Sequence, residues 1–190
     1  MKQLVNFDKW LFLKLNRDWQ FPLFDGLMPF MRNPIFWAPL YLFMIFFVVL
    51  NFGKKAYWWI LYATITTGFT DLVSSHFIKP AIGRIRPCND AELAGQVHML
   101  AAYCGGNGSF TSSHAANHFG MATFIFFTLH HVLGKYSWLF FIWAALICYS
   151  QVYVGVHFPF DVLGGALLGI IFGAGTAVIF KKYFGYMAPA

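Results

Sequence analysis

Long stretches without charged residues are the feature that most constrains how this chain can fold. Five stretches contain at most one Asp, Glu, Lys or Arg each: residues 33–53, 56–78, 93–134, 136–160 and 162–180. A helix that crosses the hydrocarbon core of a bilayer needs about 20 mainly apolar residues. Charged residues make up only 11% of the 190-residue chain, whereas a soluble domain carries about a quarter. The sequence therefore predicts an all-α integral membrane protein.

The apolar stretches divide into five predicted transmembrane helices that form one polytopic bundle. The third stretch is too long for one helix, and its first part, AAYCGGNGSFTSS, is rich in turn-forming residues and predicts a loop. We place the spans at 33–53, 56–78, 113–134, 137–156 and 160–180. No repeat or linker indicates a second domain. Residues 1–190 are thus predicted to be one membrane-embedded domain, with a transmembrane bundle over 33–180 and a functional loop over 79–112.

The first 32 residues differ from the rest. Apolar and aromatic residues such as Trp10 and Trp19 alternate there with Asp8, Lys9 and Arg17, so no uncharged run is long enough to span. Aromatic side chains of this kind are enriched at the level of the lipid headgroups. We expect residues 1–32 to form an amphipathic segment lying in the membrane interface rather than a cleavable signal peptide.

Five spans determine which connections share a membrane face. Residues 1–32, the loop 79–112 and the turn around His157 fall on one face. The opposite face carries the C-terminus and five lysines: Lys54, Lys55, Lys135, Lys181 and Lys182. The polar residues of three distant segments are therefore predicted to meet at one surface of the bundle.

The first of these segments, KPAIGRIRP, places Lys79, Arg84 and Arg86 where the second span leaves the membrane. Arginine offers a planar fork that grips phosphate, and lysine adds a compact charge. Basic residues at a helix end also anchor to lipid headgroups. The spacing alone leaves phosphate binding and headgroup anchoring equally open.

The second segment, SFTSSHAANH, begins the third span. Ser112 or Ser113 is predicted to cap this helix, and the first amides of a helix bind anions. His114 falls in the first turn beside the same position. The segment is thus either an anion site or a capped helix with an incidental histidine.

The third segment, VGVHFPFDVLGG, places His157 just before the last span and Asp161 in its first turn, with Pro159 suited to the helix start. A carboxylate that accepts a hydrogen bond from one ring nitrogen leaves the lone pair of the other nitrogen directed outward. This arrangement turns an imidazole into a nucleophile or a base. Its structural alternative is a pair that only stabilises the helix start.

Taken in order, the three segments resemble the signature of the type 2 phosphatidic acid phosphatase family, also called lipid phosphate phosphatases. That signature runs Lys-x6-Arg-Pro, then Pro-Ser-Gly-His, then Ser-Arg-x5-His-x3-Asp. The first part is intact here as Lys79, Arg86 and Pro87. The second part is Thr111-Ser112-Ser113-His114, and the third is Ser150-Gln151, His157 and Asp161. The resemblance covers about residues 33–180.

The resemblance implies a catalytic role for three residues. His157 is similar to the nucleophile that forms a phosphohistidine, and Asp161 to the carboxylate that orients it. His114 is similar to the general acid that protonates the leaving oxygen and then activates water. Phosphoryl oxygens would be held by Lys79, Arg86, Ser112 and the amides near Ser113. Because several cations can replace a metal ion, we predict neither a metal nor any other cofactor.

Two positions depart from the family pattern. Gln151 stands where the family has arginine, so one phosphate-binding charge is missing and only neutral donors remain. We predict that Arg84 compensates. Ser113 stands where the family has glycine and adds a hydroxyl beside the predicted anion site. Both changes point to an altered substrate or a weaker enzyme.

Two further features concern the same face. Cys88 and Cys104 lie in the loop, and a disulfide between them would tether it if this face is periplasmic. Cys148 is predicted to be buried and free. Asp71 lies within the second span, two turns before Lys79, where it is predicted to support that lysine.

The expected partners are the bilayer and a membrane lipid phosphate, with no nucleic acid; the oligomeric state is not predicted. Polyprenyl (undecaprenyl) diphosphate is the favoured substrate, with phosphatidic acid, phosphatidylglycerol phosphate and lipid A phosphates as alternatives. We expect a bacterial inner-membrane protein whose active site faces the periplasm. Two rival classes are a haem or metal protein that uses His114, His118 and His157, and a non-catalytic lipid-binding protein.

Overall fold

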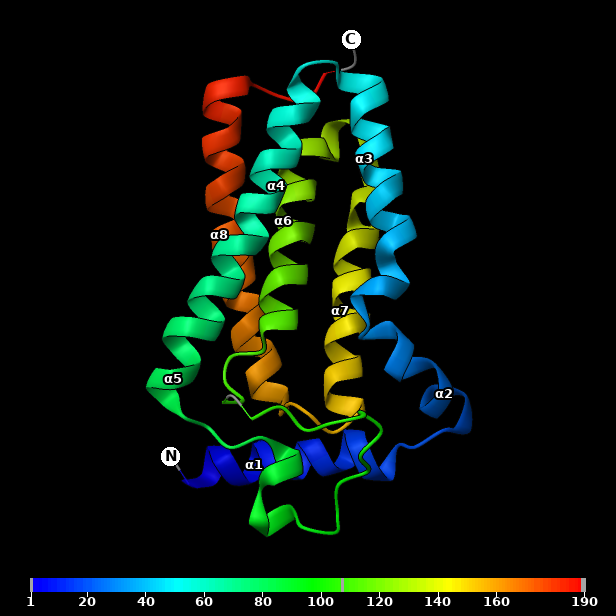
Figure 1. The fold of residues 1–190 in the computed structure, drawn as a ribbon, viewed down its shortest axis with the longest axis vertical. Helices are drawn as coiled ribbons and strands as arrows, with labels where there is room; N and C mark the ends of the chain where they lie inside the picture. Colours follow the sequence, from blue (N-terminus) through cyan, green and yellow to red (C-terminus); the bar gives the residue numbers. More distant parts are fainter. Residues whose placement is uncertain (1, 107, 189–190) are drawn as a thin grey trace.

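The computed structural model describes residues 2–106 and 108–188, and these contain helices and loops but no strand. The long helices run along one axis as a bundle (Figure 1): α3 (Ala38–Phe52), α4 (Lys55–Leu72), α6 (Ser113–Leu133), α7 (Leu139–Tyr153) and α8 (Pro159–Phe184). The predicted all-α membrane bundle is confirmed.

Three helical stretches are long and apolar enough to cross a membrane: Pro34–Phe52, Ser113–Tyr153 and Pro159–Phe184. The second stretch contains both α6 and α7, which a 3₁₀ turn over Gly134–Trp138 joins. The predicted second span corresponds to α4 and its continuation through a π-helical turn, Val73–Ile78, into α5 (Lys79–Ile82). This helix is not among the three, since α4 carries several threonines and Asp71. The count of five spans stays a prediction.

The two ends of the bundle differ in what they carry. One end, called the site end below, holds α1 (Lys2–Leu13), α2 (Pro22–Met31), the loop 83–112 and the α7–α8 turn (Figure 1). The other, the far end, holds the α3–α4 and α6–α7 connections and the end of α8. The predicted gathering of three distant segments at one surface is therefore observed.

Helices α6 and α8 pack most closely, and glycines on α8 make this possible. A Cβ atom on Gly165 would lie 2.4 Å from the Ser112 carbonyl oxygen, and one on Gly169 would lie 2.3 Å from that of Ala116. Small residues allow helix backbones in a membrane to approach in this way. The close approach brings the first turn of α6, with His114, against the first turns of α8, with Asp161.

Helix α1 lies crosswise beneath the bundle (Figure 1). It buries Asp8 and Phe12 against the protein and leaves Leu4, Val5, Phe7 and Trp10 exposed. Lys9 pairs with Asp90 at 2.5 Å and with Glu92 at 2.7 Å, which ties the helix to the loop. An exposed apolar face beside a docked polar one suits a helix at the membrane interface, as the sequence predicts.

Candidate active site

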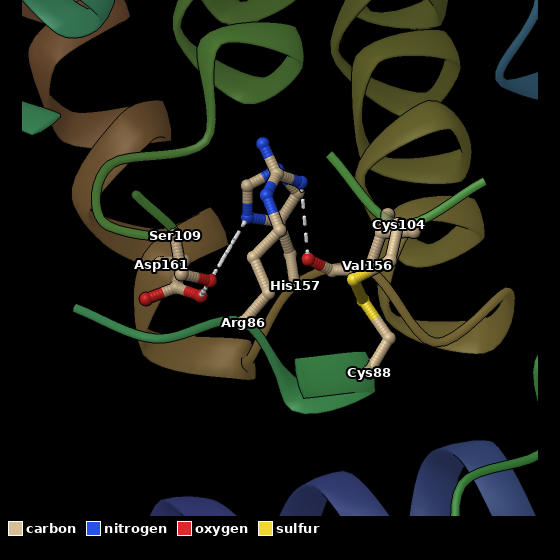
Figure 2. The surroundings of a disulfide bond; sticks show 7 residues. All are labelled: Arg86, Cys88, Cys104, Ser109, Val156, His157 and Asp161. Atoms are coloured by element: carbon tan, nitrogen blue, oxygen red, sulfur yellow. Dashed lines mark hydrogen bonds and ion pairs between the residues drawn. A yellow bond between two sulfur atoms is a disulfide. The ribbon is translucent and has the colours of Figure 1, made fainter. Parts of the chain in front are cut away.

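His157 occupies the turn between α7 and α8 and is buried. Its Nδ1 atom lies 3.6 Å from Asp161 Oδ2 and 3.4 Å from Ser109 Oγ. Figure 2 shows one ring nitrogen directed toward Ser109 and Asp161. Burial lowers the pKa of His157 to about 4; the Asp161 carboxylate opposes this, and the charge of Arg86 adds to it. The imidazole is therefore neutral at neutral pH and retains a lone pair.

Asp161 is held by several donors. Its Oδ2 atom accepts a hydrogen bond from the Ser109 hydroxyl and another from the Phe158 backbone amide at 2.8 Å. Its Oδ1 atom accepts from Arg84 Nη1 at 2.7 Å. Carboxylates that accept charge-assisted bonds of this kind are held in one orientation. Asp161 can thus orient the imidazole from a fixed position.

The two arginines of the first motif have different partners. Arg86 Nη1 lies 3.3 Å from His157 Nε2 and donates to the Val156 carbonyl oxygen at 3.3 Å. Arg84 instead forms ion pairs with Asp161 at 2.7 Å and with Asp8 at 2.6 Å. Two carboxylates thus contact the Arg84 guanidinium, and phosphate binding by Arg84 in place of the missing arginine stays a prediction.

Lys79 reaches the start of α6, where its Nζ atom donates to Ser113 Oγ at 2.7 Å. The same hydroxyl lies 2.9 Å from both Ser74 Oγ and Ser75 Oγ. Ser75 in turn donates to Asp71 at 3.3 Å. Ser113 therefore links Asp71 to Lys79 through hydroxyl groups, an indirect form of the predicted support.

Ser112 caps α6. Its Oγ atom accepts from the Ala115 amide at 3.4 Å, and its own amide donates to the Asp161 carbonyl oxygen at 2.9 Å. His114 follows in the first turn and is half-buried, with its ring stacked 6.3 Å from that of His118. It lies within electrostatic range of His157 and Lys79. The structure therefore brings the second motif to the same site as the first and third.

Gln151, the residue at the third motif's altered position, is fully buried in α7. Its backbone carbonyl oxygen accepts from the Val156 amide at 3.2 Å and from the His157 amide at 3.3 Å, which shapes the turn before α8. Neither side-chain atom, Oε1 or Nε2, has a hydrogen-bond partner among the described residues. Its side-chain amide is neutral, so it does not supply the charge that arginine would.

A disulfide joins Cys88 to Cys104, with their Cα atoms 6.0 Å apart (Figure 2). The bond lies beside Arg86, and a Cβ atom on the neighbouring Gly105 would sit 3.2 Å from the Arg86 guanidinium carbon. The loop therefore packs directly on this cation. Cys148 is buried and unbonded.

Sequence reasoning missed Asp8, Ser109 and Arg32. Asp8 is fully buried although it comes from the amphipathic N-terminal segment, and it also accepts from the Phe160 amide at 3.0 Å. Ser109 sits in a turn-rich loop that gives no sign of a contact with Asp161. Arg32 follows α2 and lines a pocket with His114. Only the unusual placement of an acid among apolar residues could have drawn attention to Asp8.

The described residues contain no group of three or more His, Cys, Asp or Glu side chains that could hold a metal ion. Instead, the charged groups that act on the buried imidazole are Arg86, Lys79 and Asp161. This arrangement is suited to binding an anion next to a neutral nitrogen nucleophile.

Comparisons with known proteins identify relatives of this chain. The family model of the PAP2 superfamily matches residues 56–185. A lipid A 4'-phosphatase of Bacteroides thetaiotaomicron is 31% identical over 153 residues, which are 78% of this chain and 66% of that protein. An undecaprenyl-diphosphatase of Bacillus subtilis is 32% identical over 114 residues, 60% of this chain and 54% of that protein. This chain thus spans less than two thirds of the length of either relative.

The same fold occurs in a solved structure. The crystal structure of a transmembrane PAP2-type phosphatidylglycerolphosphate phosphatase from Bacillus subtilis superposes with a TM-score of 0.71 at 23% identity, covering 97% of this chain and 89% of that one. At this identity the likeness concerns the fold alone. With a family model that matches more than half of its residues, this integral membrane protein belongs to the PAP2 superfamily.

Proposed function

We propose that this protein is a metal-independent lipid phosphatase that works through a phosphohistidine intermediate. The observation that carries the proposal is the environment of His157: Nδ1 faces Asp161 and Ser109, while Nε2 faces Arg86. A neutral imidazole with one nitrogen facing a carboxylate and a hydroxyl presents the other nitrogen as the nucleophile.

In the first step, His157 Nε2 attacks phosphorus and the bond between phosphorus and the leaving oxygen breaks. The lost electron pair stays on that oxygen, which takes a proton from His114 in its protonated form. Transfer of a phosphoryl group depends mainly on positioning and on neutralising charge on the equatorial oxygens. We assign that task to Arg86, Lys79 and the first amides of α6 near Ser113.

In the second step, water hydrolyses the phosphohistidine. Neutral His114 takes a proton from water as the oxygen attacks phosphorus, and the bond to His157 Nε2 breaks. Inorganic phosphate is released and both histidines return to their starting state. A well-placed general acid or base contributes a factor on the order of 10²–10⁴ in rate.

The substrate we propose is an amphiphile whose tail stays in lipid while its phosphate enters the site end. A polyprenyl diphosphate such as undecaprenyl diphosphate is the favoured candidate. Lipid A phosphate, phosphatidic acid and phosphatidylglycerol phosphate are the alternatives. The names of the relatives support this class, since they cover a lipid A 4'-phosphatase and an undecaprenyl-diphosphatase.

We also propose that the site end faces the periplasm of a bacterial inner membrane. The Cys88–Cys104 disulfide lies at this end, and disulfides persist in oxidising compartments. The far end carries lysines and no acid, which suits the cytoplasmic side. Thiol labelling of intact cells with a membrane-impermeant reagent, using single cysteines introduced at each end, tests the orientation.

The decisive experiment measures phosphate release by purified protein from a panel of lipid monophosphates and diphosphates. Release that persists in EDTA, stops with vanadate and disappears in His157→Ala supports the proposal. His76→Ala is a matched control, because His76 is exposed on the π-helical turn before Lys79. A folded protein that binds the lipids without releasing phosphate would instead be a lipid-binding relative.

A further inference from the structure

The mechanism proposed above assigns no role to Arg32. It follows α2 directly and is half-buried. Its guanidinium has no hydrogen bond or ion pair to another residue in the ranges 2–106 and 108–188, whereas Arg84 holds two carboxylates and Arg17 holds Asp18. Burial lowers the pKa of Arg32, and only the Tyr103 phenol opposes this. A half-buried guanidinium usually has an anionic partner.

The side chain lines a pocket of about 550 Å³ together with Asn33, Leu100, Tyr103 and His114. The charge of Arg32 acts on Arg86 and on His114, so Arg32 contributes to the electrostatic potential of the active site. Arg32 does not line the neighbouring pocket that Lys79, Arg84 and Arg86 share. The two pockets therefore place Arg32 on the His114 side of the site.

This placement matters because the two histidines act on different bonds. His157 attacks phosphorus, whereas His114 donates a proton to the leaving oxygen. A cation that shares a pocket with His114 therefore contacts the leaving group rather than the equatorial oxygens. Hydrolysis of phosphatidic acid releases a neutral alcohol, which offers such a cation no charge, whereas hydrolysis of a lipid diphosphate releases an anionic lipid monophosphate.

Resting on the function proposed above, we propose that Arg32 binds the phosphate of the leaving group and makes the enzyme selective for lipid diphosphates. His157 Nε2 forms its bond to the terminal phosphorus, and the bond between that phosphorus and the bridging oxygen breaks. The bridging oxygen receives its proton from His114, and its phosphate stays bound to Arg32 until it departs. Water then releases the terminal phosphoryl group as inorganic phosphate.

The test compares kcat/KM for a prenyl diphosphate with kcat/KM for phosphatidic acid in the same detergent. Loss of a charge-assisted contact in Arg32→Gln is expected to reduce the diphosphate-to-monophosphate ratio by about 20-fold. Arg32→Lys should restore part of the ratio, since it keeps the charge but not the fork. Arg17→Gln is the matched control, because Arg17 is exposed and paired with Asp18, and its ratio should equal that of the wild type.

An unchanged ratio in Arg32→Gln overturns the inference. If kcat/KM falls equally for both substrates, Arg32 acts in the steps that the two substrates share. If kcat/KM changes for neither substrate, Arg32 anchors to lipid headgroups. Should the wild type release no phosphate at all, the proposed function fails instead. Binding then decides about Arg32: a wild-type preference for inorganic pyrophosphate over phosphate that Arg32→Gln removes supports the anion site, and equal affinities contradict it.

Discussion

The two ends of this bundle bury different kinds of side chain. The far half is stabilised by an apolar cluster in which Trp59, Phe124 and Phe180 are buried against one another. The site end instead buries charge: Asp8, Asp161 and Lys79 are each less than a tenth exposed. Buried charges are costly unless they are paired. The comparison indicates that the far half supplies stability, which the site end uses to hold a polar arrangement suited to chemistry.

The largest expected effect is on activity at the site end. Asp161→Asn removes the negative charge that faces His157 Nδ1 and one of the two carboxylates of Arg84. We expect kcat to fall by about 10³-fold or more, by analogy with loss of the orienting carboxylate in a catalytic triad. Single-turnover measurement of phosphoenzyme formation checks this. A variant with near-normal kcat would show that Asp161 has only a structural role.

The next prediction concerns the far half, where a substitution should lower stability and leave activity unchanged. Phe124→Ala removes a fully buried ring from the far half, and its expected cost is about 3–5 kcal/mol of unfolding free energy. Thermal unfolding in detergent measures this cost. At temperatures well below the unfolding transition, kcat should stay within about 2-fold of the wild type. Loss of kcat at low temperature would mean that the two regions are not independent.

Reduction of the Cys88–Cys104 disulfide should have a smaller effect that falls on the site end. The bond closes a loop with a sequence separation of 16, and its loss is expected to cost about 3 kcal/mol by the loop-entropy estimate. Because the loop packs on Arg86, we expect KM to rise as well. Cys88→Ala with Cys104→Ala is the test and Cys148→Ala the control. Identical KM values with and without the bond would exclude a role in binding.

A further prediction tests whether the N-terminal helix belongs to the active site. Asp8→Asn leaves Arg84 with a single carboxylate. Since small displacements of a catalytic group are costly, we expect kcat to fall by about 10-fold with little change in KM. Asp18→Asn is the control, because the partners of Asp18 among the described residues, Lys14 and Arg17, belong to its own segment. Equal behaviour of the two variants would place α1 outside the site.

The smallest effect is expected from acid. Protonation of Nε2 abolishes the nucleophile, and burial lowers the pKa of His157 to about 4. The rate of phosphoenzyme formation should therefore show no loss from this group between pH 7 and pH 5, and should decline as the pH approaches 4. An acid limb near the ordinary histidine value of about 6.5 would contradict the buried, neutral imidazole. Rapid-quench measurements across this range are the check.

Folding stability should depend on pH in the same direction as the rate, and fall in acid. Between about pH 6.5 and pH 4 the unfolded chain binds a proton at His157 that the folded chain does not, so the contribution of this group to stability is complete above pH 6.5 and is lost as the pH falls to 4. Comparing the pH dependence of thermal unfolding for the wild type and His157→Ala isolates this contribution.

The sequence alone determined the membrane bundle and the gathering of its polar segments. Runs of apolar residues predict helices that span a bilayer, and an ordered series of spans assigns each connection to one face. The positions of Lys79, Arg86, His114, His157 and Asp161 at one end follow from that order. The glycines of α8 are also informative from the local sequence, because a small residue every four positions predicts close helix packing.

Only the tertiary structure decided which partner each charge has. Arg84 and Arg86 are two residues apart in one motif, yet one holds Asp8 and Asp161 while the other faces His157. Likewise, no local pattern predicts the partners of Asp8 or the place of Arg32 in the pocket beside His114. The physical reason is that burial and pairing depend on side chains that arrive from segments far apart in the chain, and a local pattern contains no information about their direction.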